Sequence, residues 1–201
     1  MKDMDRFVNF SDAVIAIAVT ILVLPLVDRA SDVHINSYHD FHTNLSQPLL
    51  VFLLSFIVIC RYWQVHHNIL NGIRTFTPGL FWLNAAWLTS IVLIPLTSEI
   101  ISKASDMNVF VSTLYIGSLA LVSYISVAMQ LLIAHNPTLY RLKASPATKS
   151  TGFAVAISMS LALLLGLIPG VGPWALLVLI PAAYAGKALQ ILRSRAEGQD
   201  A

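Results

Sequence analysis

Long apolar stretches alternate with short polar connections along the whole of this 201-residue chain. Apolar windows of about 19 residues predict helices that cross a membrane. We expect six such helices, over residues 7–28, 46–70, 77–101, 108–134, 150–168 and 172–192. The pattern therefore predicts an all-α membrane protein with a single six-helix transmembrane domain that covers residues 1–201.

The boundary between the last two predicted helices depends on the sequence Leu-Ile-Pro-Gly-Val-Gly-Pro-Trp. Proline and glycine at this density favour a tight turn between two helices. The alternative is one kinked helix of about 40 residues, which is longer than a membrane crossing needs. Gly170-Val171-Gly172 invites comparison with a carbonyl filter, but a filter needs a pore helix and a re-entrant loop, and this turn is too short for them.

The first predicted helix starts with polar residues and continues into an apolar run. Residues 13–27 contain only one polar side chain, that of Thr20. Fifteen helical residues rise about 22 Å, whereas the hydrocarbon core of a bilayer is about 30 Å thick. A helix that crosses the membrane must therefore begin near Phe7, which places Ser11 and Asp12 at the membrane edge. An ionisable side chain there is costly without partners, so it marks a functional or architectural site.

Composition excludes several classes of protein. The chain is 57% hydrophobic and only 11% charged, which leaves no room for a soluble domain. A net charge of +2 gives no reason to expect a nucleic-acid partner, and the single cysteine, Cys60, excludes a disulfide framework. We find no nucleophile motif, phosphate-binding loop or zinc signature, so we expect neither an enzyme nor a bound cofactor or metal.

Basic residues are distributed unevenly between the two sides of the predicted topology. One side holds Lys2, Arg6, Arg61, Arg74, Arg141, Lys143, Lys149, Lys187, Arg193 and Arg195, and the other holds Arg29 and Lys103. Because cytoplasmic segments of membrane proteins carry the excess of Lys and Arg, we expect both termini in the cytoplasm. The even number of predicted helices agrees with this topology.

The first helix has two different faces when its residues are placed at about 100° intervals. A sector of about 100° contains Ala13, Ile17, Thr20, Ile21, Leu24 and Asp28. Asp12 lies about 140° away from Ile17, so its carboxylate needs a partner within the protein. Ordinary packing against neighbouring helices also explains the apolar sector, and spacing alone does not decide between a packing surface and a functional one.

Candidate partners for Asp12 occur near the predicted cytoplasmic ends of the second and third helices. The expected network comprises Arg6, Ser11, Asp12, Asn84 and either His66 or His67, with Trp63 as an anchor at the membrane interface. A buried and an exposed position are equally compatible with His67, whereas we expect His66 to be exposed. In the long polar connection over residues 29–44, His34, His39 and His42 are compatible with a divalent metal, a pH response or ordinary loop composition.

The pattern Arg6-x-x-x-Phe10-Ser11-Asp12 at the start of the first helix resembles the signature of the transmembrane protein 175 family. This family comprises endolysosomal potassium channels and their shorter bacterial homologues. The resemblance covers the whole chain in helix count and orientation. It extends to the following Ala-Ile-x-x-Thr run and to Trp63, His67 and Asn84.

The resemblance implies a bacterial inner-membrane homotetramer in which the four first helices line a central pore without a carbonyl filter. It implies a hydrophobic constriction or gate at Ile17, Ile21 and Leu24, with Thr20 as a polar pore-lining residue. It also implies that the inner end of this helix is anchored by Arg6, Phe10, Ser11, Asp12, Trp63, His67 and Asn84.

We therefore predict a passive, potassium-preferring channel for monovalent cations in a lipid bilayer. Asp28 is expected at the outer mouth, where four copies would concentrate cations, although Pro25 leaves its phase on the helix open. Two other functions stay compatible with the sequence. One is a proton-linked secondary transporter in which Asp12 and His66 or His67 form a relay, and the other is a membrane scaffold that transports nothing.

Overall fold

The computed structural model describes residues 2–34, 36–71, 73, 75, 77–104, 109–136, 139, 156–157 and 159–168. The predicted helix over residues 172–192 lies outside the described residues, together with most of the turn before it and the C-terminal basic segment.

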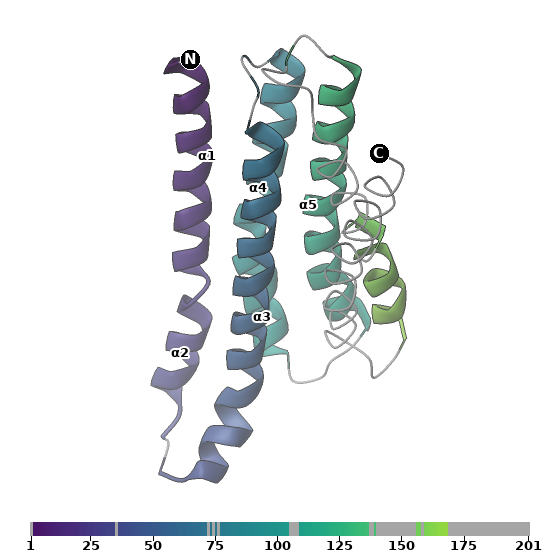
Figure 1. Ribbon diagram of the computed structural model, residues 1–201. Coiled ribbons are helices and arrows are strands. Elements are labelled where there is room, and N and C mark those ends of the chain that lie inside the picture. Colours follow the sequence, from purple (N-terminus) through teal and green to yellow (C-terminus); the bar gives the residue numbers. More distant parts are fainter. Residues whose placement is uncertain are drawn as a thin grey trace, which may run out of the picture.

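The described part of the chain is built from antiparallel helices. They are α1 (Lys2–Ile21), α2 (Leu24–Asp32), α3 (Tyr38–Leu70), α4 (Pro78–Lys103) and α5 (Val109–His135). Residues 156–157 and 159–166 are helical as well. In Figure 1, the α1–α2 pair, α3, α4 and α5 pack together, and each runs opposite to the one before it.

Within the described residues, four segments are long and apolar enough to cross a membrane. They are Met4–Asp32, Tyr38–Leu70, Pro78–Lys103 and Val109–His135. These segments correspond to the first four predicted membrane helices. The chain is therefore a multi-pass membrane protein with an all-helical fold.

The first membrane segment is interrupted near its middle. α1 ends at Ile21 and α2 begins at Leu24, so the helix predicted over residues 7–28 consists of two pieces. Pro25 lies in the first turn of α2 and has no backbone N–H to donate to the carbonyl of Ile21. Across the interruption, the Val23 N–H donates to the Thr20 carbonyl at 3.4 Å. A single helical wheel therefore does not extend from α1 to Asp28.

The polar connection predicted over residues 29–44 is much shorter than expected. α2 continues to Asp32 and α3 already begins at Tyr38, so this prediction is wrong. The reason is a capping box at the start of α3. The Ser37 hydroxyl accepts a hydrogen bond from the Asp40 N–H at 3.2 Å, and the Asp40 carboxylate accepts one from the Ser37 N–H at 3.1 Å. This reciprocal pair starts a helix among polar residues that would otherwise favour a loop.

Hydroxyl groups join α3, α4 and α5 in the interior of the bundle. The Ser55 and Tyr115 hydroxyls are 2.6 Å apart, and the Tyr62 hydroxyl donates to the Leu119 carbonyl at 2.6 Å. The Trp87 indole N–H donates to the Ser126 hydroxyl at 2.8 Å. Because a bilayer offers such groups no water, these bonds orient the helices relative to one another.

α1 packs on α3 and α4 through one face only. Its buried side chains follow each other at intervals of three or four residues and are Met4, Phe7, Ser11, Ile15 and Ala18, and Leu22 directly after the helix is buried as well. That spacing places all of them on one side of a helix. The opposite side of α1 is left uncovered in the single chain.

Candidate pore helix and its anchoring site

A buried hydrogen-bond chain ties α1 to α4 and α3. The Asn84 amide nitrogen donates to the Ser11 hydroxyl at 3.0 Å, and the Asn84 carbonyl oxygen lies 2.6 Å from His66 Nε2. The Ser11 hydroxyl in turn donates to the Phe7 carbonyl one helical turn earlier at 3.1 Å. All three side chains in this chain of contacts are at most 2% exposed, so their polar groups depend on each other.

The position of His66 in this hydrogen-bond chain contradicts the prediction from the sequence. His66 was expected to be exposed, but it is only 1% exposed and stacks on Trp87 with ring centroids 4.1 Å apart. The physical reason is its register on α3, where Ser55, Ile59, Tyr62 and His66 recur at intervals of three or four residues and are all buried. That spacing was readable in the sequence and would have identified His66 as an inward-facing residue.

His67 lies outside this buried chain. It is exposed, and its ring lies 6.0 Å from that of Trp63, measured between centroids. The Trp63 indole N–H donates to the Asp12 carboxylate at 2.9 Å. Asp12 therefore does have a partner, as expected, but this partner is a tryptophan of α3 and not a histidine.

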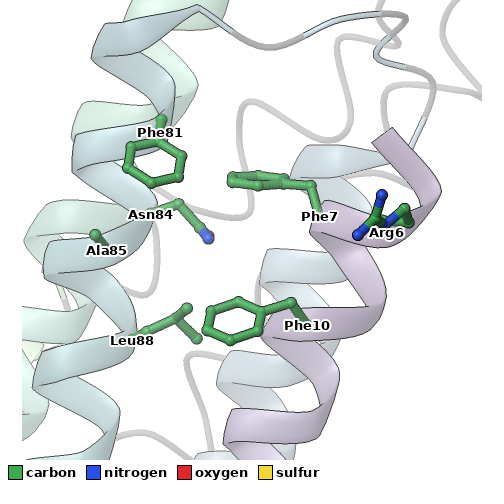
Figure 2. A pocket seen from close by; sticks show the side chains of 7 residues that line it. All are labelled: Arg6, Phe7, Phe10, Phe81, Asn84, Ala85 and Leu88. Atoms are coloured by element: carbon green, nitrogen blue, oxygen red, sulfur yellow. The ribbon is translucent and has the colours of Figure 1, made fainter. Parts of the chain in front are cut away.

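Arg6 and Phe10 lie beside a cavity between α1 and α4. Its volume is about 390 Å³, and its lining consists of Arg6, Phe7, Phe10, Phe81, Asn84, Ala85 and Leu88. Figure 2 shows Phe7 opposite Phe81, and Phe10 opposite Leu88. Arg6 is exposed and Phe10 is 62% exposed, so neither is held within the buried chain of contacts.

The three predicted constriction residues are exposed on the single chain. The exposed fractions are 59% for Ile17, 42% for Ile21 and 52% for Leu24. Thr20 is also exposed, and its hydroxyl donates to the Ile17 carbonyl at 2.8 Å. Asp28 is exposed on α2. The α1–α2 segment thus presents an apolar stripe with one hydroxyl on the side away from its anchors.

The loop histidines do not form a metal centre in the part of the chain that the structure describes. No group of three His, Cys, Asp or Glu residues there is arranged to hold a metal ion. His39 and His42 belong to α3, whereas His34 precedes it.

Comparisons with known proteins bear on the same segment. Residues 6–95 match the family model described as endosomal/lysosomal potassium channel TMEM175. The matched region contains all of the predicted pore-helix and anchoring residues.

Curated relatives agree with this match. A potassium channel of Chryseobacterium sp. is 31% identical over 113 residues, which cover 56% of each chain. The endosomal/lysosomal proton channel TMEM175 of Rattus norvegicus is 24% identical over 102 residues, 51% of this chain and 20% of the rat protein. The matches therefore span about half of the bacterial relative and a fifth of the mammalian one.

A solved structure extends the similarity to the overall fold. The crystal structure of a lysosomal potassium-selective channel TMEM175 homolog from Chamaesiphon minutus superposes with a TM-score of 0.68. The superposition covers 95% of this chain and 98% of that one at 17% sequence identity, which supports a common fold. Together, the family model and the curated relatives show that the N-terminal half of this chain is similar to TMEM175 channels, and the solved structure shows that the fold is similar over nearly the whole chain.

Proposed function

We propose that the chain is the subunit of a passive cation channel that prefers K⁺, with four copies arranged around a pore lined by α1 and the start of α2. The observation that carries the proposal is the stripe of Ile17, Ile21 and Leu24. These large apolar side chains are exposed on a helix whose other face is held by a buried polar network. Relatives named as potassium and proton channels support an ion-conducting role.

The proposed constriction acts through its apolar surface. A ring of isoleucine and leucine side chains conducts only when it is wide enough to stay wet, and it dewets when it narrows. Ions pass such a ring by shedding part of their hydration shell, which favours K⁺ over the more strongly hydrated Na⁺ to a modest extent. The anchors at Ser11 and Asp12 fix the rotation of α1, and therefore determine which side chains reach the pore axis.

The proposed topology places both termini in the cytoplasm of a bacterial cell. Asp28 then lies at the outer mouth, where four carboxylates raise the local cation concentration. Thr20 supplies a hydroxyl oxygen between the levels of Ile17 and Ile21, where an ion has lost part of its water.

The direct test is flux through the purified protein. In K⁺-loaded liposomes, the protein should release K⁺ without an energy source, and its mass in detergent should be that of a tetramer. Ile17→Asn should increase the leak, because an amide keeps the constriction wet. Ile57→Asn is the matched control, since Ile57 is 66% exposed on α3, outside the proposed pore. A lack of flux above that of protein-free liposomes contradicts the proposal, and equal effects of the two variants contradict the placement of the pore.

A proton-linked transporter is the second candidate. The observation that favours it is His66, a buried titratable group whose Nδ1 has no hydrogen-bond partner among the described residues. That candidate predicts substrate uptake driven by a pH gradient and abolished in His66→Phe. Flux that persists without any gradient other than that of K⁺ favours the channel.

A further inference from the structure

The exposed face of α1 that carries Ile17 extends toward the N-terminus of the helix. Arg6 and Phe10 precede Ile17 by eleven and seven residues, so both lie within about 20° of it around the helix axis. At 1.5 Å per residue, Phe10 is about 10 Å and Arg6 about 16 Å along the axis from Ile17. The three side chains therefore occupy one face at successive depths.

Exposure agrees with this geometry. Phe10 at 62% and Ile17 at 59% are the most exposed large apolar side chains of α1, and Arg6 is exposed as well. The helix is anchored by Ser11 and Asp12, which point in other directions and reach Asn84 and Trp63. Arg6 and Phe10 are thus not needed to explain how α1 is held against its neighbours.

We propose that Arg6 and Phe10 line the N-terminal mouth of the pore, and that a ring of four Arg6 guanidinium groups makes cation flow asymmetric. This inference rests on the proposed function, because it requires four α1 helices around one axis. The guanidinium groups repel cations that arrive from the N-terminal side, whereas Asp28 attracts cations at the opposite end. Cation current toward the N-terminal side is therefore larger than current in the reverse direction.

Neighbouring charges leave the positive ring in place. Among the described residues, the only ion pair is Glu99–Lys103, so Arg6 is not neutralised by a described carboxylate. Asp5 and Asp12 lie about 100° and about 120° around the helix from Arg6. The Arg6 guanidinium is therefore the charged group on this face, and four chains bring four such groups to it.

The size of the asymmetry follows from Coulomb's law with screening. Four unit charges about 10 Å from the axis, in water with about 0.1 M salt, change the local cation concentration about threefold. At about 0.01 M salt the Debye length is about 30 Å, so the effect becomes larger. We therefore expect rectification that increases as ionic strength falls.

The test is the ratio of the larger to the smaller single-channel current at equal and opposite voltages in symmetric KCl. Arg6→Gln should lower this ratio about threefold in about 0.1 M KCl, and Arg6→Lys should keep it, because the guanidinium acts through its charge. Arg61→Gln is the matched control. Arg61 is a basic residue of α3 two positions before Trp63, and its guanidinium hydrogen-bonds to Gln64 of the same helix. An unchanged ratio in Arg6→Gln overturns the inference.

A second measurement needs no change at Arg6. In Asp28→Asn, which lacks the outer carboxylates, rectification should persist and should still increase from about 0.1 M to about 0.01 M KCl. Its disappearance in this variant assigns the asymmetry to Asp28 and overturns the role of Arg6. The two levels of proposal fail separately. Absence of any K⁺ conduction by the wild-type protein contradicts the channel, whereas conduction that Arg6→Gln leaves equally asymmetric contradicts only the role of the N-terminal mouth.

Discussion

Asn84 is the residue on which the anchoring network depends, and its replacement by leucine gives the sharpest test of that network. Leucine has a similar size but removes both hydrogen bonds, at 3.0 Å to Ser11 and at 2.6 Å to His66. Ser11 keeps its bond to the Phe7 carbonyl, so its hydroxyl stays satisfied. His66 has no such reserve, because its Nδ1 already has no partner among the described residues.

The cost of Asn84→Leu follows from these contacts. Hydrogen bonds between membrane helices are each worth about 0.6 kcal/mol on average. A buried polar group that is left without a partner costs about 1–3 kcal/mol more. This applies to the imidazole of His66, which is only 1% exposed. We therefore expect Asn84→Leu to lower the free energy of unfolding by about 2–4 kcal/mol.

The reasoning also predicts how a second substitution repairs the first. His66→Phe removes the stranded nitrogen and keeps an aromatic ring against Trp87. The double variant Asn84→Leu, His66→Phe should therefore be more stable than Asn84→Leu alone by about 1 kcal/mol, because a polar pair has been replaced by two apolar groups.

The assay is reversible unfolding in mixed micelles with increasing SDS, followed by far-UV circular dichroism. Asn68→Leu is the control, since Asn68 is exposed on the same helix as His66 and should change stability by less than about 0.5 kcal/mol. A double variant that is no more stable than Asn84→Leu refutes the argument, because the cost would then come from packing and not from an unsatisfied imidazole.

Three further predictions concern single contacts. Trp63→Phe removes the indole N–H that donates to Asp12. It should lower the free energy of unfolding by up to about 1 kcal/mol in the same assay, because the contact is partly exposed. A larger loss would indicate that Asp12 becomes buried in the assembled protein. Pro25→Ala restores a backbone N–H that can donate to the Ile21 carbonyl, so amide hydrogen exchange at the α1–α2 interruption should become slower. Unchanged exchange would show that packing, and not proline, breaks the helix. Tyr62→Phe removes the hydrogen bond that the Leu119 carbonyl of α5 accepts at 2.6 Å, while the Ser123 hydroxyl still donates to that carbonyl at 3.4 Å. Unfolding should therefore become easier by only about 0.6 kcal/mol, and a loss well above about 1 kcal/mol would contradict this reasoning.

The sequence by itself determined the helical membrane architecture and the importance of the start of the first helix. Apolar windows located the first four membrane helices because a bilayer admits only segments that satisfy their own backbone, and this constraint is local. The sequence also identified Ser11 and Asp12 as residues that need partners, since their depth follows from helix length alone. Helical periodicity placed Ile17 and Ile21 on one face of the first helix in the same way, whereas Leu24 belongs to α2, after the interruption.

Only the tertiary structure decided which partners these groups have. It paired Asn84 with Ser11 and with His66, and Asp12 with Trp63, because contacts between α1, α3 and α4 depend on how the helices are rotated against one another. His66 and His67 are neighbours in sequence, yet one stacks on Trp87 in the interior and the other is exposed. Composition cannot distinguish them, whereas helix rotation separates them by about 100° and thereby decides which one holds the proposed pore helix.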